Sequence, residues 1–368
     1  MSELNDIIKR YVINYSKSEL IDILKLIYQN EFGPAHLVEN NELTIDRIIT
    51  EGVAAKTIAR PGIMAMPIGN GLARVHCALF LQAFLADITL AGKMLGSMFA
   101  VTSELHKGTE ARFKEKVDDL LEMVKEGEFD HSDISLKKWA RSFKETKAEV
   151  DRYAEEGYPI PSHSHEYKQM YHPCYRVVYE DFLKYTELFL LLEQQLSFGR
   201  RVIVGIDGRA GAGKTTLAKI LTSVYKGSFV SMDDFYLPFS MRSEERMSKP
   251  GGHIHFERFN EQVYKPLKAV AMELNYEKYN CQTGESIPVS ASLNERLVVV
   301  EGSYSVHPWI RDLYSHTVFL DISEKSQKKR LIKRNGPEGY EIMRDKWILY
   351  ENRYHKAYGV DKYCNILF

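Results

Sequence analysis

Cysteine is scarce in this sequence and shows no pairing pattern. The four cysteines, Cys77, Cys174, Cys281 and Cys364, are scattered along 368 residues, and no CxxC pair occurs. Disulfide frameworks and zinc sites usually show regular or paired cysteine spacings. The sequence therefore predicts free thiols rather than either arrangement.

Long apolar runs are absent as well. A membrane-spanning helix needs about 20 apolar residues, whereas the run LFLLL at 188–192 stops at Glu193. The first twenty residues contain neither the apolar core nor the small-residue cleavage motif of a secretion signal. We therefore expect a cytoplasmic protein with no membrane partner.

The chain also has no excess of charge of either sign. Its formal net charge is −1, and no stripe of basic and aromatic residues stands out. This balance argues against a nucleic-acid partner, including a kinase that acts on nucleic-acid 5′-hydroxyls. The composition, 44% hydrophobic and 27% charged, is typical of a globular protein, and the length predicts two domains.

Residues 1–198 are predicted to form a mostly α-helical domain. Ser16 and Glu19 have the spacing of a capping box before a run of apolar residues at helical intervals. Thr109 is the expected N-cap of a second helix, with Phe113 among the apolar residues on one face. Further helices are predicted over 133–157 and 179–196.

After Arg201 the pattern changes to short β-branched runs that alternate with helices. Four near-continuously apolar runs end in acidic or small residues: RVIVGID, SFVSMD, RLVVVEG and HTVFLDIS. Such runs are typical of strands buried on both faces in a parallel sheet. Residues 199–368 are therefore predicted to form a three-layer α/β domain.

The segment DGRAGAGKTT, residues 207–216, joins the first predicted strand to a helix. Glycine, four residues, then Gly-Lys-Thr is the pattern of a phosphate-binding loop, whose backbone N–H groups point at phosphate oxygens. Lys214 is expected to contact the β- and γ-phosphates, and Thr215 to ligate Mg²⁺. The predicted nucleotide-binding residues are Gly208, Arg209, Ala210, Gly211, Ala212, Gly213, Lys214, Thr215 and Thr216.

The fate of the terminal phosphate depends on what lies beside this loop. No Asn-Lys-x-Asp motif of a guanine-reading GTPase occurs. A small-molecule kinase needs a carboxylate that takes the proton of the acceptor hydroxyl. Asp233 and Asp234 follow the second predicted strand, whose carboxyl end lies at the same sheet edge as the loop. This placement favours a kinase.

The loop, the stretch DDFY at 233–236 and the strand ending VVVEGSYS resemble the uridine kinase, pantothenate kinase and phosphoribulokinase group of P-loop kinases. The resemblance covers residues 199–368. It implies that Asp233 is the catalytic base, that Tyr236 lines the acceptor pocket and that Glu301 helps to hold Mg²⁺.

The same resemblance implies a lid rich in Arg and Lys that clamps the transferred phosphoryl group. On the predicted helix after the fourth strand, Arg330 and Arg334 lie four residues apart, as do Lys329 and Lys333, so each pair shares a face. We select the two arginines, because a guanidinium matches phosphate oxygens better than an ammonium group.

The acceptor region departs from the family pattern. Members often carry an Asp before an aromatic residue or Pro there, whereas GGHIHFERFN offers His253 and His255. His255 and Arg258 are therefore candidate acceptor contacts, as is Asp234. The departure leaves the identity of the acceptor open.

Two polar segments of the first half have no assigned role. The segment PIPSHSHEYKQMYHPCYRVV, residues 159–178, holds His163, His165 and His172 without a zinc-site spacing. The segment YQNEFGPAHLV, residues 28–38, places His36 beside a helix end. A structural or surface role is favoured for each histidine, and contact with a ligand or with the kinase domain is the alternative.

The sequence thus predicts a kinase that uses ATP and Mg²⁺ to phosphorylate a hydroxyl of a small metabolite, with a nucleoside as the first candidate. Its catalytic residues would be Asp233, Lys214, Arg330 and Arg334. The alternative is a nucleotide-dependent regulatory module that phosphorylates no acceptor. A homodimer is compatible with both.

Overall fold

The computed structural model describes residues 3–34, 41–55, 64–84, 87–127, 143–281, 283–293 and 295–368. The chain divides into two compact units, Met1–Thr186 and Glu187–Phe368. His36 and the first part of the helix predicted over 133–157 lie outside the described residues. No helix in the described ranges is both long enough and apolar enough to cross a membrane.

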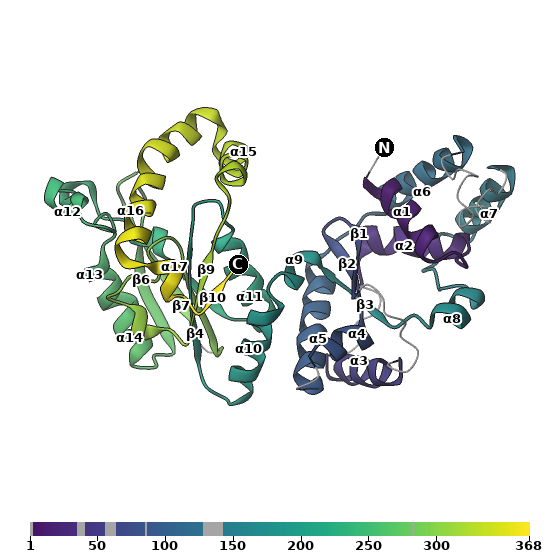
Figure 1. The fold of residues 1–368 in the computed structure, drawn as a ribbon, viewed down its shortest axis with the longest axis horizontal. Helices are drawn as coiled ribbons and strands as arrows, with labels where there is room; N and C mark the ends of the chain where they lie inside the picture. The colour runs from purple at the N-terminus through teal and green to yellow at the C-terminus, as the bar shows by residue number, and fades with distance from the viewer. Residues whose placement is uncertain are drawn as a thin grey trace. The chain divides into compact units, whose positions relative to one another are not determined.

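The N-terminal unit is rich in helices, as predicted, and also contains a small sheet (Figure 1). The helices are α1 (Glu3–Asn14), α2 (Leu20–Phe32), α3 (Asn41–Ala55), α4 (Cys77–Ala83), α5 (Ile88–Leu105), α6 (Glu110–Lys125), α7 (Phe143–Glu155), α8 (His165–Tyr171) and α9 (Glu180–Leu183). The antiparallel sheet has the order β1 (Ala65–Gly69), β2 (Leu72–His76), β3 (Tyr175–Tyr179). Helices α1 and α2 contact β1, whereas α5 contacts β3.

This sheet was not predicted, although its turn carries a recognisable signal. Asn70 and Gly71 connect β1 to β2 with φ angles of 53° and 69°. An Asn-Gly pair with positive φ is the preferred connection of a tight hairpin, because its twist matches that of the flanking strands. The last helix predicted for this half begins differently too, since Tyr179 ends β3.

The two predicted helix starts have different outcomes. Thr109 caps α6 as expected, and its hydroxyl accepts a hydrogen bond from the Arg112 N–H at 3.3 Å. The prediction for Ser16 was wrong, because α2 begins at Leu20 and the Asp22 carboxylate accepts the Glu19 N–H at 2.9 Å. The reciprocal cap therefore uses Glu19 and Asp22.

The C-terminal unit has a five-stranded parallel sheet, which confirms the predicted α/β fold (Figure 1). The strand order is β10 (Ile366–Leu367), β9 (His316–Leu320), β4 (Val202–Gly208), β8 (Leu297–Glu301), β5 (Ser228–Ser231). All four predicted strands are present and pair in parallel. Every residue of β4 and β8 is buried, as expected for the centre of a three-layer domain.

The remaining elements of this unit surround the sheet. The helices are α10 (Thr186–Ser197), α11 (Lys214–Tyr225), α12 (Glu244–Ser248), α13 (Phe256–Phe259), α14 (Lys265–Lys268), α15 (Glu324–Ile342), α16 (Leu349–Tyr358) and α17 (Val360–Tyr363). A separate hairpin consists of β6 (Glu273–Tyr279) and β7 (Ser286–Ser292). Helix α10 packs on α11, where the Tyr225 hydroxyl donates to the Phe189 carbonyl at 3.2 Å. The compact units divide after Thr186, the first residue of α10, and the boundary after residue 198 stays a prediction from the sequence.

Candidate active site

The phosphate loop, residues 208–215, lies between β4 and α11. Gly208 has a φ of +142°, and a Cβ there would lie 2.2 Å from the Leu320 carbonyl oxygen of β9, so only glycine fits. The first N–H groups of α11 have no partner within the helix, and the helix dipole places positive potential at the same end. The Lys214 ammonium donates to the carbonyls of Gly208 and Arg209 at 2.8 and 3.1 Å. The segment thus has the local geometry expected of a phosphate-binding loop.

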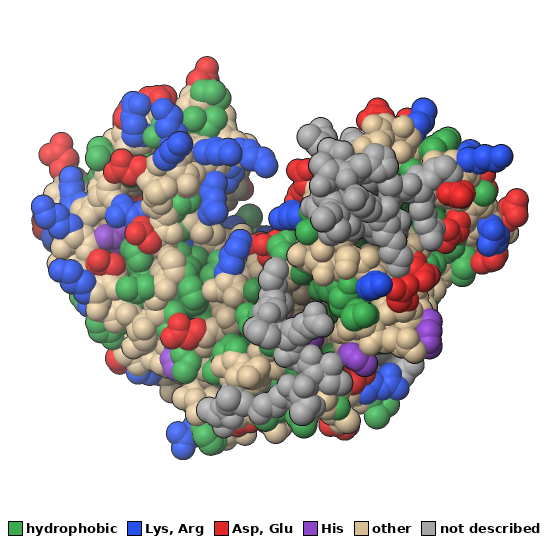
Figure 2. Space-filling model, turned by 45° about the vertical axis from the view of Figure 1, so that its right-hand side comes forward, with side chains coloured by type: hydrophobic (Ala, Val, Ile, Leu, Met, Phe, Trp, Pro, Cys, Tyr) green, Lys and Arg blue, Asp and Glu red, His purple; other side chains and the backbone are tan. Residues whose placement is uncertain are grey.

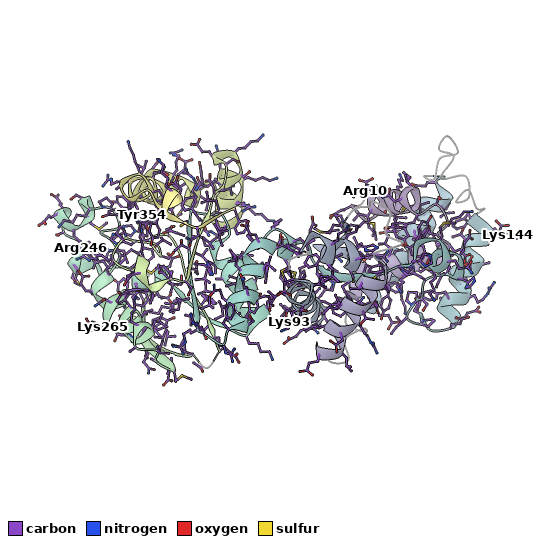
Figure 3. All side chains as sticks on the ribbon, turned by 60° about the horizontal axis from the view of Figure 1, so that its bottom comes forward. Arg10, Lys93, Lys144, Arg246, Lys265 and Tyr354 are labelled. Atoms are coloured by element: carbon purple, nitrogen blue, oxygen red, sulfur yellow. The ribbon has the colours of Figure 1, made fainter. Side chains whose placement is uncertain are left out.

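A buried carboxylate fixes the start of this loop. Asp207 accepts hydrogen bonds from the N–H groups of Gly208 at 2.7 Å and Val306 at 3.0 Å, and from the Tyr354 hydroxyl at 2.8 Å. Tyr354 comes from α16 and lies in the interior of the unit (Figure 3). Burial alone would raise the pKa of Asp207, but the hydrogen bond and charge of His355 hold that pKa below its usual value.

Two C-terminal helices hold the loop from the other side. Glu351 of α16 accepts the Ala210 N–H at 2.9 Å and the Ser303 hydroxyl at 2.5 Å. On α15, Gln327 donates to the Ala210 carbonyl at 3.0 Å, and Arg330 donates to the Gly211 carbonyl at 3.0 Å. The loop backbone is therefore positioned by side chains more than a hundred residues later in the chain.

Two carboxylates approach the loop from the ends of neighbouring strands. Glu301 ends β8, and its carboxylate lies 3.2 Å from the Thr215 hydroxyl. Burial raises the pKa of Glu301, and the negative charge of Asp233 acts in the same direction. Asp233 follows β5 and accepts a hydrogen bond from the Tyr236 hydroxyl at 3.2 Å. Burial, and then the charge of Asp233, raises the pKa of Tyr236 well above its usual value, so this phenol remains a donor.

These groups line one cavity of about 490 Å³. The predicted residues on its wall include Lys214, Thr215, Asp233, Glu301, Arg330 and Arg334. Lysine and arginine side chains gather at the top of the C-terminal unit in Figure 2, where Figure 1 places α15. The cavity thus joins a cationic wall to two carboxylates, which suits a phosphorylated ligand with a metal ion.

Part of the cavity wall is aromatic. Tyr236 and Trp347 both line it, with ring centroids 5.6 Å apart, and Cys281 and Met343 lie on the same wall. His253 stacks on Tyr236 at 5.8 Å from behind, and burial lowers the pKa of His253 to about 3. The imidazole is therefore neutral and supports the aromatic wall.

Three predicted acceptor contacts do not line this cavity. Asp234 turns away and pairs with Lys278 at 2.8 Å and with the Tyr276 hydroxyl at 3.3 Å. Arg258 donates to the Asp234 carbonyl at 2.8 Å, and His255 caps α13, where its Nδ1 accepts the Arg258 N–H. Each of the three side chains is thus held by contacts within its local structure and away from the cavity.

The oxygen ligands present fit Mg²⁺ rather than a softer metal. The Thr215 hydroxyl and the Glu301 carboxylate are neighbours at the phosphate loop, and hard oxygen ligands are those that Mg²⁺ prefers. Two protein ligands are enough where substrate phosphates and water complete the shell. No cluster of three or more His, Cys, Asp or Glu side chains suited to a metal occurs in the described part of the chain.

Comparison with known proteins agrees with this geometry. No model of a known protein family matches the sequence. A phosphoribulokinase from Synechocystis sp. is 27% identical over 151 residues, which cover 38% of this chain and 43% of that enzyme. The C-terminal unit resembles the uridine kinase and phosphoribulokinase group of P-loop kinases. This resemblance was predicted from the three motifs and is confirmed. The matched region spans less than half the length of the Synechocystis phosphoribulokinase.

Two solved structures each match a little under half of the chain. A possible uridine kinase from Bacillus stearothermophilus covers 46% of this chain and 89% of its own length, at 20% identity and a TM-score of 0.37. Shikimate kinase from Bacteroides thetaiotaomicron covers 45% and 85%, at 22% identity and a TM-score of 0.26.

Several side chains that position the loop or line the cavity of the C-terminal unit were not predicted. Asp207 was seen only as the end of a strand, and Glu351 and Trp347 lie in a C-terminal helical region that carries no phosphate-binding motif. An acidic residue at the end of a fully apolar strand was the available signal for Asp207. No sequence signal marked Glu351, because its hydrogen-bond partner Ala210 is distant in sequence.

Proposed function

We propose that the C-terminal unit transfers the γ-phosphate of ATP to a hydroxyl group of a small metabolite. The observation that carries this proposal is the single cavity that brings a phosphate loop, Asp233, Glu301 and two arginines together. A regulatory nucleotide-binding module has no need of an exposed carboxylate beside the loop. Asp233 therefore favours the kinase over that alternative.

Each side chain has its own role in the proposed transfer. Asp233 accepts the proton of the acceptor hydroxyl, and Tyr236 orients that carboxylate through its hydrogen bond. Lys214, Arg330 and Arg334 offset the charge that develops on the phosphoryl oxygens. Thr215 and Glu301 would hold Mg²⁺, which when bound neutralises part of the β- and γ-phosphate charge.

The aromatic wall supports an acceptor with a planar ring. Tyr236 and Trp347 present ring faces or edges to the cavity, and such side chains bind flat, apolar surfaces well. A nucleoside combines a planar base with sugar hydroxyls and is the first candidate. Sugars, vitamins and hydroxy-amino acids follow it.

The test is turnover with Mg²⁺, ATP and a panel of these four acceptor classes. ADP release and a gain of one phosphate in acceptor mass are measured together. Asp233→Asn should lower transfer at least about a hundredfold, while the dissociation constant of ATP changes little because the loop is intact.

Asp312→Asn is the matched control, since Asp312 lies in an exposed ion pair with Lys268. It should leave turnover unchanged. Equal turnover in Asp233→Asn and the wild type would remove Asp233 as the base. ATP binding without transfer to any member of the panel would favour the regulatory module instead.

A further inference from the structure

The N-terminal unit contains a buried guanidinium that is only partly paired. Arg74 lies in the middle of β2 and is 4% exposed. Its Nε donates to the Gln29 Oε1 at 2.8 Å. Within the described residues, its two terminal nitrogens, NH1 and NH2, have no hydrogen-bond partner. A buried cationic group with free donors is costly unless something accepts from it.

Two more donors around Arg74 are also unsatisfied. The Tyr11 hydroxyl and the Gln29 Nε2 are buried and have no hydrogen-bond partner in the part of the chain that the structure describes. The Arg74 guanidinium lies over the Tyr11 ring at 5.2 Å and over the Tyr175 ring at 4.7 Å. The three unsatisfied nitrogens can only donate, whereas the Tyr11 hydroxyl can donate or accept, so a group that completes the nitrogens must accept.

Two buried carboxylates of α2, the helix that carries Gln29, are already occupied. Asp22 accepts from the His163 Nδ1 at 2.7 Å, the Ser164 N–H at 3.0 Å and the Ser164 hydroxyl at 2.7 Å. Glu31 pairs with Lys116 at 2.5 Å and with Arg112 at 3.2 Å. Neither is placed to neutralise Arg74.

A second cation increases the positive potential of this cluster. Lys25 lies on α2 one turn from both Asp22 and Gln29, and its side chain is half-buried. Burial, and next the charge of Arg74, lowers the pKa of Lys25 to about 8. The two cations therefore disfavour each other and would both be stabilised by one anion between them.

We propose that the N-terminal unit binds an oxyanion, the carboxylate or phosphate group of a small metabolite, at a site formed by Arg74, Tyr11 and Gln29. The two terminal N–H groups of an arginine match two oxygens of a carboxylate or phosphate. The Tyr11 hydroxyl and the Gln29 amide supply further donors. The site is independent of the proposed kinase activity of the other unit.

The two polar segments without an assigned role contribute Gln29 to the site and His163 and Tyr175 to its surroundings. Gln29 comes from the segment 28–38, whereas His163 and Tyr175 come from the segment 159–178. His163 bridges Asp22 and the Tyr175 hydroxyl, each at 2.7 Å. Tyr15, Tyr171 and Tyr175, which surround the cluster, are half-buried. Sequence segments that are far apart thus converge on Arg74.

The test is hydrogen–deuterium exchange of the full-length protein with potassium phosphate or sodium acetate, against chloride at equal ionic strength. We expect one or both oxyanions to slow exchange in peptides from α2 and β2. This readout is local, so phosphate bound at the loop of the other unit does not interfere. Arg74→Met should abolish the protection, whereas Arg112→Met, which removes an exposed guanidinium of the same unit, should keep it.

A second variant covers the case in which Arg74→Met fails to fold. Tyr11→Phe removes only a hydroxyl that has no partner among the described residues, so the unit should fold and bind the oxyanion about tenfold more weakly. Tyr153→Phe, whose hydroxyl donates to the Pro159 carbonyl, should bind as the wild type does. Protection by phosphate alone identifies a phosphoryl ligand, and protection by acetate alone identifies a carboxylate. The proposal would be overturned if neither anion gave protection. It would also be overturned if protection persisted in Arg74→Met or was undiminished in Tyr11→Phe.

Discussion

Replacing Asp207 by asparagine should lower the free energy of unfolding of the C-terminal unit by about 3 kcal/mol. Both carboxylate oxygens of Asp207 accept a backbone N–H, one from Gly208 at 2.7 Å and one from Val306 at 3.0 Å. Whichever way the asparagine amide lies, its NH₂ group meets one of these donors. The variant therefore leaves a buried backbone N–H unsatisfied.

The magnitude follows from two contributions. An unsatisfied buried donor costs about 1–3 kcal/mol, and hydrogen bonds to a charged acceptor exceed neutral ones by about 1 kcal/mol. Tyr354→Phe is the matched control, because it removes a single hydrogen bond of 2.8 Å to the same carboxylate. It should cost about half as much.

Urea unfolding followed by tryptophan fluorescence measures both variants. The chain has three tryptophans, and a Trp139→Phe background leaves Trp309 and Trp347 to report on the C-terminal unit. The pKa of Asp207 in the folded state lies below its usual value. Ionised Asp207 therefore stabilises the fold above the unfolded pKa, near pH 4. This contribution is lost as the pH falls through the folded pKa. The difference between wild type and Asp207→Asn should shrink there. Equal stability at neutral pH would refute this account of the network.

Two further variants test the carboxylates of the cavity. Glu301→Gln should raise the melting temperature at neutral pH without Mg²⁺. The pKa of Glu301 is raised in the folded state, so its ionised form lowers stability above the unfolded pKa. Mg²⁺-dependent turnover should fall in this variant, and a lower melting temperature would contradict the reasoning. Tyr236→Phe removes the hydrogen bond to Asp233 and should reduce kcat about tenfold with the dissociation constant of ATP unchanged; an unaltered kcat would show that this contact does not orient the base.

The central fold of the C-terminal unit was predictable because its strands are buried on both faces. Strands β4 and β8 have no exposed residue, so each appears as a short apolar run, and the phosphate loop follows one of them. The sheet of the N-terminal unit gave a weaker pattern. Strand β2 has the charged Arg74 inside, which breaks the apolar run that would have marked a buried strand.

The candidate site was predictable only where local motifs supply it. Asp233 and Glu301 end strands at the same sheet edge as the loop, so their approach follows from the strand pattern. His255 and Arg258 were chosen by position between motifs, but their side chains complete α13 and the Asp234 turn. Glu351 reaches the loop through tertiary packing alone, which no local pattern encodes.

Arg330 and Arg334, the two arginines predicted for a lid, differ in what they contact, although they share a helix face. Arg330 donates to the carbonyls of Gly211 and Ala212 at 3.0 and 3.3 Å, and with Gln327 it ties the first turns of α15 to the phosphate loop. Arg334 lies one turn further along the same face, and its hydrogen bond to Asn335 is a local contact between neighbours. Arg330 therefore holds α15 against the loop in addition to lining the cavity. If the proposed transfer takes place, we expect Arg334 to be the arginine of α15 with the freer side chain for the transferred phosphoryl group.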